Sequence, residues 1–398
     1  MTTPAPPKQG APQGGGKAAA PAMAPWPFPV GVLDTQNASD YDQVKTMSTG
    51  AVQFPDVQVQ PDGWTRGIWF DVNGVATSNT NTVTFNSDAA AGTGAPFSAI
   101  NTVLFRDTGG EQIFGPFNGY DWMTTNKFGG YHEVGDPRAD YNYSTTTGSA
   151  TNSGSFHFSL YLPLEISAAD SLGDVENRSE NSIYRVSLTL EQSSVVYGQA
   201  PLNLPAVEVK TTQDSYTEPV AALSLSGRPV SQAPPSPGTL QYWKQEDDSS
   251  IPGSGAHSTL ITNGIGNGYR NIIFKLIRSS GTRANGTSDW PDPQELDLGT
   301  TRIRNLYKKT WQDKMIRAFG FTGGSSADVA LGLENGIFTQ WFDLDTGTRP
   351  GNESRRKYLR TKPGNTFKVR GTYGNAGTLY ITSNYIVPRN NDFSQIVR

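Results

Sequence analysis

The feature that most constrains the fold is a plan that occurs twice along the chain. Residues 100–129 contain an apolar strand (INTVLF), a charged glycine turn, a second short apolar run and the aromatic-rich segment GYDWMTTNKFG. Residues 271–320 contain a strand (NIIFKLI), a glycine-rich stretch and NLYKKTWQDKMIRAFG, the clearest helix pattern in the chain. Two β-domains that each carry a strand and a helical insert indicate a duplicated β-sandwich rather than an enzyme with a lid.

A proline-rich break separates the two copies. Four of the residues in SGRPVSQAPPSPG, at 226–238, are prolines, which remove backbone donors and forbid a continuous strand or helix. A chain of 398 residues also exceeds what one hydrophobic core usually serves. We therefore expect an N-terminal arm at 1–30, a first sandwich at 31–225, a linker at 226–238, a second sandwich at 239–390 and a tail at 391–398.

Two segments show the alternation of strands that have one buried face. Apolar residues occupy every second position from Phe156 to Leu162 and again from Tyr184 to Leu190. The polar connection between them is too long for a hairpin, so we expect these strands to pair with others or to lie in different sheets. With 43 Gly and 27 Pro between short apolar runs, the chain is predicted to be all-β.

One amphipathic helix is predicted over residues 305–319. Tyr307, Trp311 and Met315 recur at a spacing of four, and Ala318 and Phe319 extend the same stripe. Charged side chains fall elsewhere, and the following glycine favours a left-handed stop. This pattern indicates a helix packed on a sheet.

Charge is distributed unevenly along the chain. Residues 1–301 hold 16 basic and 29 acidic side chains, a balance of −13, whereas residues 302–370 hold 14 basic and 6 acidic, a balance of +8. Complementary poles favour subunits that meet acidic face to basic face. Two ordinary solvated surfaces are the alternative, and the whole-chain charge of −4 argues against a DNA-coating protein. The candidate interface residues are Arg302, Arg304, Lys308, Lys309, Arg355, Arg356 and Lys357.

The first 30 residues have the composition of an arm that does not fold alone. They contain eight prolines and, as charges, only Lys8 and Lys17. The segment ends in two large aromatic groups on a stiff backbone, Trp26 and Phe28. We expect both to dock on a sandwich or on a neighbouring subunit, and we count them among the assembly candidates.

Motifs of catalysis and cofactor binding are incomplete. His132 opens a partial zinc-helix motif that Pro137 interrupts, and Asp343-Leu344-Asp345 departs from a calcium loop at its later positions. The glycines at 264, 266 and 268 precede a strand rather than a helix, and neither G-x-S-x-G nor GK[ST] occurs. We predict no enzyme activity, cofactor or metal, although a glycosidase, which needs only two carboxylates, stays open.

The chain carries no cysteine, so no disulfide or thiolate site is expected. It opens MTTPAPPKQG without the pattern of a signal peptide, and no run of 18 apolar residues occurs. We expect synthesis in a host cytoplasm.

Several segments resemble the major capsid proteins of tectiviruses, tailless icosahedral phages with double-stranded DNA and an internal membrane. The likeness is carried by FHFSLYLPLEISAADSLGDVENRSENSIYRVSLTLEQSS and by AINTVLFRD followed by NGYDWMTTNKFGG. It covers residues 97–220 best. Over residues 300–390 a basic helix, LRTKPGNTFKVRGTYGN and TLYITSNYIV keep the order of elements.

The resemblance implies an all-β double jelly roll, two jelly-roll sandwiches in tandem with a few short helices in loops. Three chains would form a pseudo-hexameric capsomer of the virion capsid. The partners implied are the other chains of a homotrimer, neighbouring capsomers, and penton, minor capsid or membrane proteins of the virion. The arm departs from the family, in which it is often a helix that touches the membrane, because its composition forbids a long helix.

A second function stays open. A carbohydrate-binding or receptor-binding β-sandwich protein of a virion would use exposed aromatic groups to stack on sugars. Its candidates are Trp64, Trp122, Trp243 and Trp290, although such residues are more often core or interface anchors.

Overall fold

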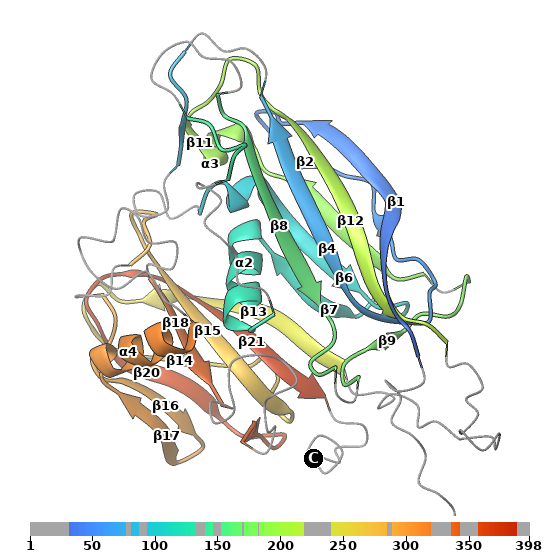
Figure 1. Ribbon diagram of the computed structural model, residues 1–398. Helices are drawn as coiled ribbons and strands as arrows, with labels where there is room; N and C mark the ends of the chain where they lie inside the picture. Colours follow the sequence, from blue (N-terminus) through green and yellow to red (C-terminus); the bar gives the residue numbers. More distant parts are fainter. Residues whose placement is uncertain are drawn as a thin grey trace, which may run out of the picture.

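Two β-sandwiches lie side by side in the computed structural model (Figure 1). The described residues are 32–76, 81–86, 94–131, 140–145, 153–168, 171–181, 183–218, 240–284, 289–319, 336–342 and 357–387. The predicted all-β class is confirmed. The arm at 1–30, the linker at 226–238 and the tail at 391–398 lie outside the described residues.

The first sandwich is built from two sheets. One has the order β1-β12-β4-β8 and the other contributes β7-β6-β10-β2, with β3 also on β10. Their bounds are β1 Asp34–Thr46, β2 Val52–Gln53, β3 Val57–Gln58, β4 Trp64–Val75, β6 Ile100–Arg106, β7 Gln112–Phe117, β8 Phe156–Pro163, β10 Arg185–Leu190 and β12 Ala206–Tyr216. The small elements are β5 Thr84–Phe85, η2 Phe97–Ala99, β9 Val175–Glu176, α3 Ser193–Val196 and β11 Tyr197–Gln199.

The second sandwich has sheets of order β18-β15-β21-β13 and β14-β20-β16-β17, with β19 on β15. Their bounds are β13 Leu240–Ile251, β14 Gly255–Leu260, β15 Gly268–Arg278, β16 Gln294–Leu298, β17 Thr301–Leu306, β18 Ile337–Trp341, β19 Leu359–Arg360, β20 Phe367–Tyr373 and β21 Gly377–Val387.

The two sandwiches share one topology. If the main strands of each are numbered 1 to 8 in chain order, with β2 and β3 taken as one broken strand, both have sheets ordered 1-8-3-6 and 2-7-4-5. Helices α2 (Gly119–Phe128) and α4 (Lys308–Phe319) both lie between strands 5 and 6. The internal repeat of the sequence therefore has a structural counterpart. The two strands that the sequence matched to each other are not equivalent. INTVLF lies in β6, which is strand 4 of its sandwich, whereas NIIFKLI lies in β15, which is strand 3 of its own.

The expected alternation is present in both marked strands. In β8 the apolar side chains from Phe156 to Leu162 are buried while His157 and Ser159 are half-buried, and β10 shows the same alternation. The two strands lie in different sheets, as their long connection predicted.

Helix α4 begins later than predicted. Strand β17 continues to Leu306, so Tyr307 lies at the corner before the helix and is 66% exposed. The buried residues of α4 are Trp311, Gln312 and Met315. The predicted stripe is therefore correct for Trp311 and Met315 and wrong for Tyr307.

A single sheet runs through both sandwiches. Strand 5 of the first, β7, pairs in parallel with strand 1 of the second, β13, where Trp243 faces Phe114. One hydrophobic core cluster extends over both halves. Helix α2 lies between the sandwiches, next to β13 and β15 (Figure 1).

Candidate functional site

The junction between the sandwiches holds a buried ion pair. The Asp121 carboxylate of α2 binds Lys275 Nζ of β15 and accepts a hydrogen bond of 3.1 Å from Gln245 Nε2 of β13. Asp121 and Lys275 are only 3% and 5% exposed. Because buried charges require partners, this pair ties the first sandwich to the second.

The last turn of α2 also ends on the second sandwich. The Phe128 carbonyl accepts hydrogen bonds of 2.7 Å from Asn271 Nδ2 and from Trp341 Nε1. The Gly129 carbonyl accepts one of 2.9 Å from a guanidinium nitrogen of Arg270, which is fully buried. These donors satisfy carbonyls that a helix end leaves without intrahelical partners.

The outer face of the β1-β12-β4-β8 sheet is acidic and hollowed. A groove of about 710 Å³ crosses it, lined among others by Tyr41, Asp42, Trp69, Asp71 and Lys210. The Asp42 and Asp71 side chains remain 54% and 47% exposed. Lys210 Nζ lies 3.7 Å from Asp42, so part of the negative charge on this face is paired within the chain.

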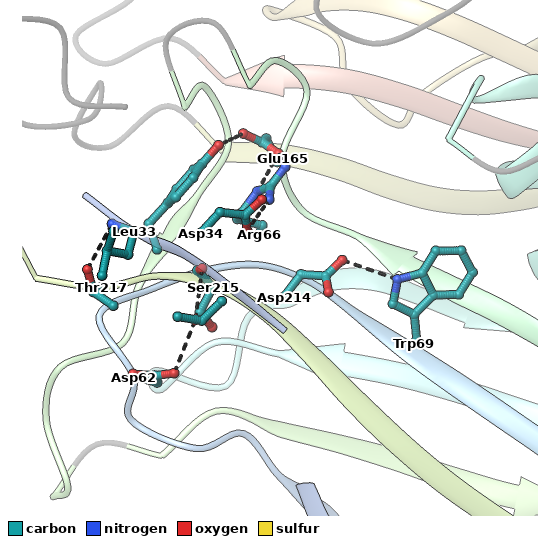
Figure 2. Close-up of polar contacts among 11 residues, drawn as sticks. Leu33, Asp34, Asp62, Arg66, Trp69, Glu165, Asp214, Ser215 and Thr217 are labelled. Carbon is teal, nitrogen blue, oxygen red and sulfur yellow. Dashed lines mark hydrogen bonds and ion pairs between the residues drawn. The ribbon is translucent and has the colours of Figure 1, made fainter. Parts of the chain in front are cut away.

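Further along the same face, Arg66 joins two carboxylates (Figure 2). Its guanidinium lies 2.6 Å from Asp34 and 2.7 Å from Glu165. Burial raises the pKa of Glu165 even though Arg66 opposes the shift. Trp69 Nε1 donates a hydrogen bond of 3.1 Å to Asp214, as Figure 2 shows.

A histidine on this face lies between two carboxylates. His157 Nε2 is 2.6 Å from Asp71 and Nδ1 is 3.0 Å from Asp140. Burial lowers the pKa of His157, but the hydrogen bonds to Asp140 and Asp71 outweigh it and raise the pKa above its ordinary value. The imidazolium form is therefore the one that this surface stabilises.

The stabilising effect of His157 is expected to depend on pH. Since its pKa is raised on folding, its contribution is complete below the unfolded pKa of about 6.5 and is lost as pH rises through the folded pKa. The unfolding free energy of His157→Gln should therefore fall furthest below that of the parent near pH 5.5, and the difference should shrink by pH 9. Ser159→Ala, which removes an uncharged donor to Asp71, serves as the control and should cost the same at both values. A difference for His157→Gln that does not vary with pH would contradict the assignment.

Several of the predicted basic residues have partners within the chain. Arg302 lies 2.7 Å from Glu295, Lys309 lies 2.8 Å from Asp313, and both cations are on the surface. The Arg304 guanidinium is 5.6 Å from the ring centre of Phe342. Arg304 and Lys357 border a groove of about 970 Å³ beside α4. The Lys308 amide donates a hydrogen bond to Asp292 where the helix begins. Trp26, Phe28, Arg355 and Arg356 lie outside the described residues.

The tryptophans proposed for sugar stacking are core residues. Trp64, Trp122, Trp243 and Trp290 are between 0% and 7% exposed. These four side chains are therefore not available on the surface of the described chain for stacking on sugars.

The segment before β15 is a turn, as its glycines predicted. His132, Asp343 and Asp345 lie outside the described residues. Within the described ranges, no cluster of three His, Asp or Glu side chains suits a metal ion, and none of the helices there is long and apolar enough to cross a membrane.

These features define the fold as a double jelly roll, and solved structures share it. The crystal structure of the major capsid protein of Sulfolobus turreted icosahedral virus aligns over 89% of this chain and 97% of its own, with a TM-score of 0.59 and 13% identity. A chain from the atomic structure of that virus aligns over 92% and 94%, with a TM-score of 0.58 and 13% identity. The major capsid protein P2 of bacteriophage PM2 aligns over 89% and 97%, with a TM-score of 0.49 and 10% identity.

No protein-family model and no curated protein matches the sequence. The likeness to solved structures is therefore one of fold. It confirms the double jelly roll that the resemblance to tectivirus capsid proteins implied.

Proposed function

We propose that the chain is a major capsid protein, a structural protein that forms trimeric, pseudo-hexameric capsomers in the shell of an icosahedral virus. The observation that carries this proposal is the repetition of one eight-strand topology within a chain whose two sandwiches share a continuous sheet. Three copies present six similar sandwiches, so a trimer can fill a lattice site with six neighbours. The likeness to the capsid protein of Sulfolobus turreted icosahedral virus over nearly the whole of both chains supports it.

The wider setting is part of the same proposal. The virion has double-stranded DNA and an internal membrane, as in tectiviruses, and the chain is made in the host cytoplasm before it enters the capsid. Its partners are neighbouring capsomers and penton, minor capsid or membrane proteins. Trp26 and Phe28 of the arm dock at these contacts or beside the membrane.

A capsomer of this kind predicts a homotrimer in solution. Light scattering should give three times 43.0 kDa at micromolar concentration, because complementary acidic and basic faces favour a closed ring. A monomer that persists in low salt would contradict the proposal. In purified particles this chain should also make up most of the protein mass. A receptor-binding protein of the virion would be a minor component instead.

A further inference from the structure

A polar cluster lies at one end of the first sandwich, where β4 ends and β8 begins (Figure 1). Asn73 of β4 pairs there with His157 of β8, and the connection between α2 and β8 adds residues 140–142 on the same outer face. The other end of the sandwich is where the described chain begins, because Val32 packs against Trp64 at the start of β4. The cluster is therefore remote from the arm.

Hydrogen bonds within the cluster hold its side chains in place. His157 is fixed between Asp71 and Asp140. The Asp140 carboxylate also accepts a hydrogen bond of 2.9 Å from the backbone N–H of Asn142. Asn142 Nδ2 in turn donates one of 3.1 Å to Asn73 Oδ1. A ligand would meet polar groups whose positions are already fixed, which lowers the entropic cost of binding.

Three polar atoms of this cluster have no partner among the described residues. They are Asp71 Oδ2, Asn73 Nδ2 and Asn142 Oδ1. The Asp71 side chain is 47% exposed, and both asparagines are half-buried. The set contains two acceptors and one donor. A sugar hydroxyl donates and accepts at once, so it can bind a mixed set of this kind.

An exposed aromatic ring lies beside these atoms. Tyr141 is 87% exposed, and its ring centre is 6.4 Å from that of His157. Val75, on the same face of β4 as Asn73, is 46% exposed. Asp71 also lines the groove of about 710 Å³, so the cluster borders a hollow rather than a flat surface. These apolar groups suit the apolar face of a sugar ring, which stacks on aromatic side chains.

The charge of the cluster favours a neutral ligand. The His157 imidazolium already occupies the place between the carboxylates of Asp71 and Asp140, so a cationic ligand would have to compete with it. An anionic ligand would meet the exposed Asp71 carboxylate, which repels it.

We propose that this cluster binds a neutral sugar. Tyr141 stacks on the sugar ring, and the three unpartnered atoms bind its hydroxyl groups. The inference goes beyond the structural role, because it gives the capsid protein a contact with carbohydrate of a host surface. It rests on the proposed function for its setting: the arm lies at contacts within the shell or beside the membrane, and the cluster is at the opposite end of the sandwich.

Saturation-transfer NMR on the full chain tests this inference. The probes are the methyl glycosides of glucose, galactose and mannose, together with N-acetylglucosamine, and at least one of them should receive saturation. Tyr141→Ala should weaken its binding by at least about tenfold, because the stacking face is lost. Tyr307→Ala is the matched control: it removes another exposed tyrosine, at the corner before α4, and should leave binding unchanged.

Asn73→Asp tests the polar half of the site. It replaces the unpartnered amide donor by a carboxylate of the same size and keeps the acceptor for Asn142. Binding of the neutral probe should weaken by about tenfold while the thermal unfolding midpoint stays close to that of the parent. N-acetylneuraminic acid, an anionic sugar, should not bind the parent.

The inference would be overturned if no probe binds, if Tyr141→Ala binds as the parent does, if Asn73→Asp leaves the affinity unchanged, or if N-acetylneuraminic acid binds as well as the neutral sugars. Trimers that bind no sugar would leave the proposed function standing. A monomer that binds sugar through Tyr141 would contradict the proposed trimer and leave this inference standing.

Discussion

Replacing Trp311 by Ala is expected to lower the free energy of unfolding by about 3–5 kcal/mol. The side chain is 3% exposed and packs between Phe274 and Phe338. Truncation leaves a cavity under α4 and removes the donor to the Thr339 carbonyl. Denaturant unfolding monitored by circular dichroism measures the loss.

Two further variants serve as comparisons for Trp311→Ala. Trp122→Ala should cost a similar amount, since it occupies the same place in the first sandwich and is fully buried. Lys309→Ala, on the exposed side of α4, should change stability by no more than about 0.5 kcal/mol. Equal losses for Trp311→Ala and Lys309→Ala would contradict the assignment of a buried and an exposed side to α4.

The strands were predictable where one face meets solvent. In β8 and β10, buried apolar side chains alternate with half-buried polar ones, so the period of two is visible in the sequence. Strand β15 is buried from Gly268 to Leu276, so NIIFKLI shows an apolar run without alternation. Its place as strand 3 rather than strand 4 depended on pairing that no local pattern encodes.

Helix α2 was much harder to predict than α4. An amphipathic helix shows the period of its apolar residues in the sequence because one of its sides stays polar. In α4 the exposed lysines form that polar side. Helix α2 is buried on nearly every side, and its polar residues Asp121 and Asn126 are buried with partners. The period of apolar residues disappears from the sequence when both sides of a helix pack against other elements. A shared tryptophan after strand 5 is the signal that could have aligned it with α4.

The junction depends on partners far apart in the sequence. Lys275 lies within an apolar strand and meets Asp121, 154 residues away, and Arg270 meets Gly129, 141 residues away. Sequence alone could show that a charge within NIIFKLI needs a partner, but it could not identify that partner. The charge balance counted along the sequence overstates the positive charge of the second sandwich, because Arg302 is partly neutralised by Glu295 in its own sheet.

Lys275→Met is expected to be as severe as the loss of Trp311, at about 3–5 kcal/mol, because it leaves the Asp121 carboxylate buried without its cation. The methionine fills much of the same volume, so the loss reports charge rather than packing. The exposed pair Lys309–Asp313 provides the matched control, and Lys309→Met should cost no more than about 0.5 kcal/mol. Equilibrium unfolding in denaturant measures both variants.

The double variant Asp121→Leu/Lys275→Met tests whether the ion pair adds net stability to the junction or is only compatible with it. Replacing both partners of a buried pair by apolar groups is often neutral or stabilising, so most of the single-variant loss should be recovered. Full recovery with an intact trimer would mean that the two sandwiches are held together mainly by apolar burial around α2. A double variant as unstable as Lys275→Met would instead mean that the hydrogen bond from Gln245 and the cation–π contact of Lys275 with Tyr380 make the polar cluster indispensable, because both are lost together with the ion pair.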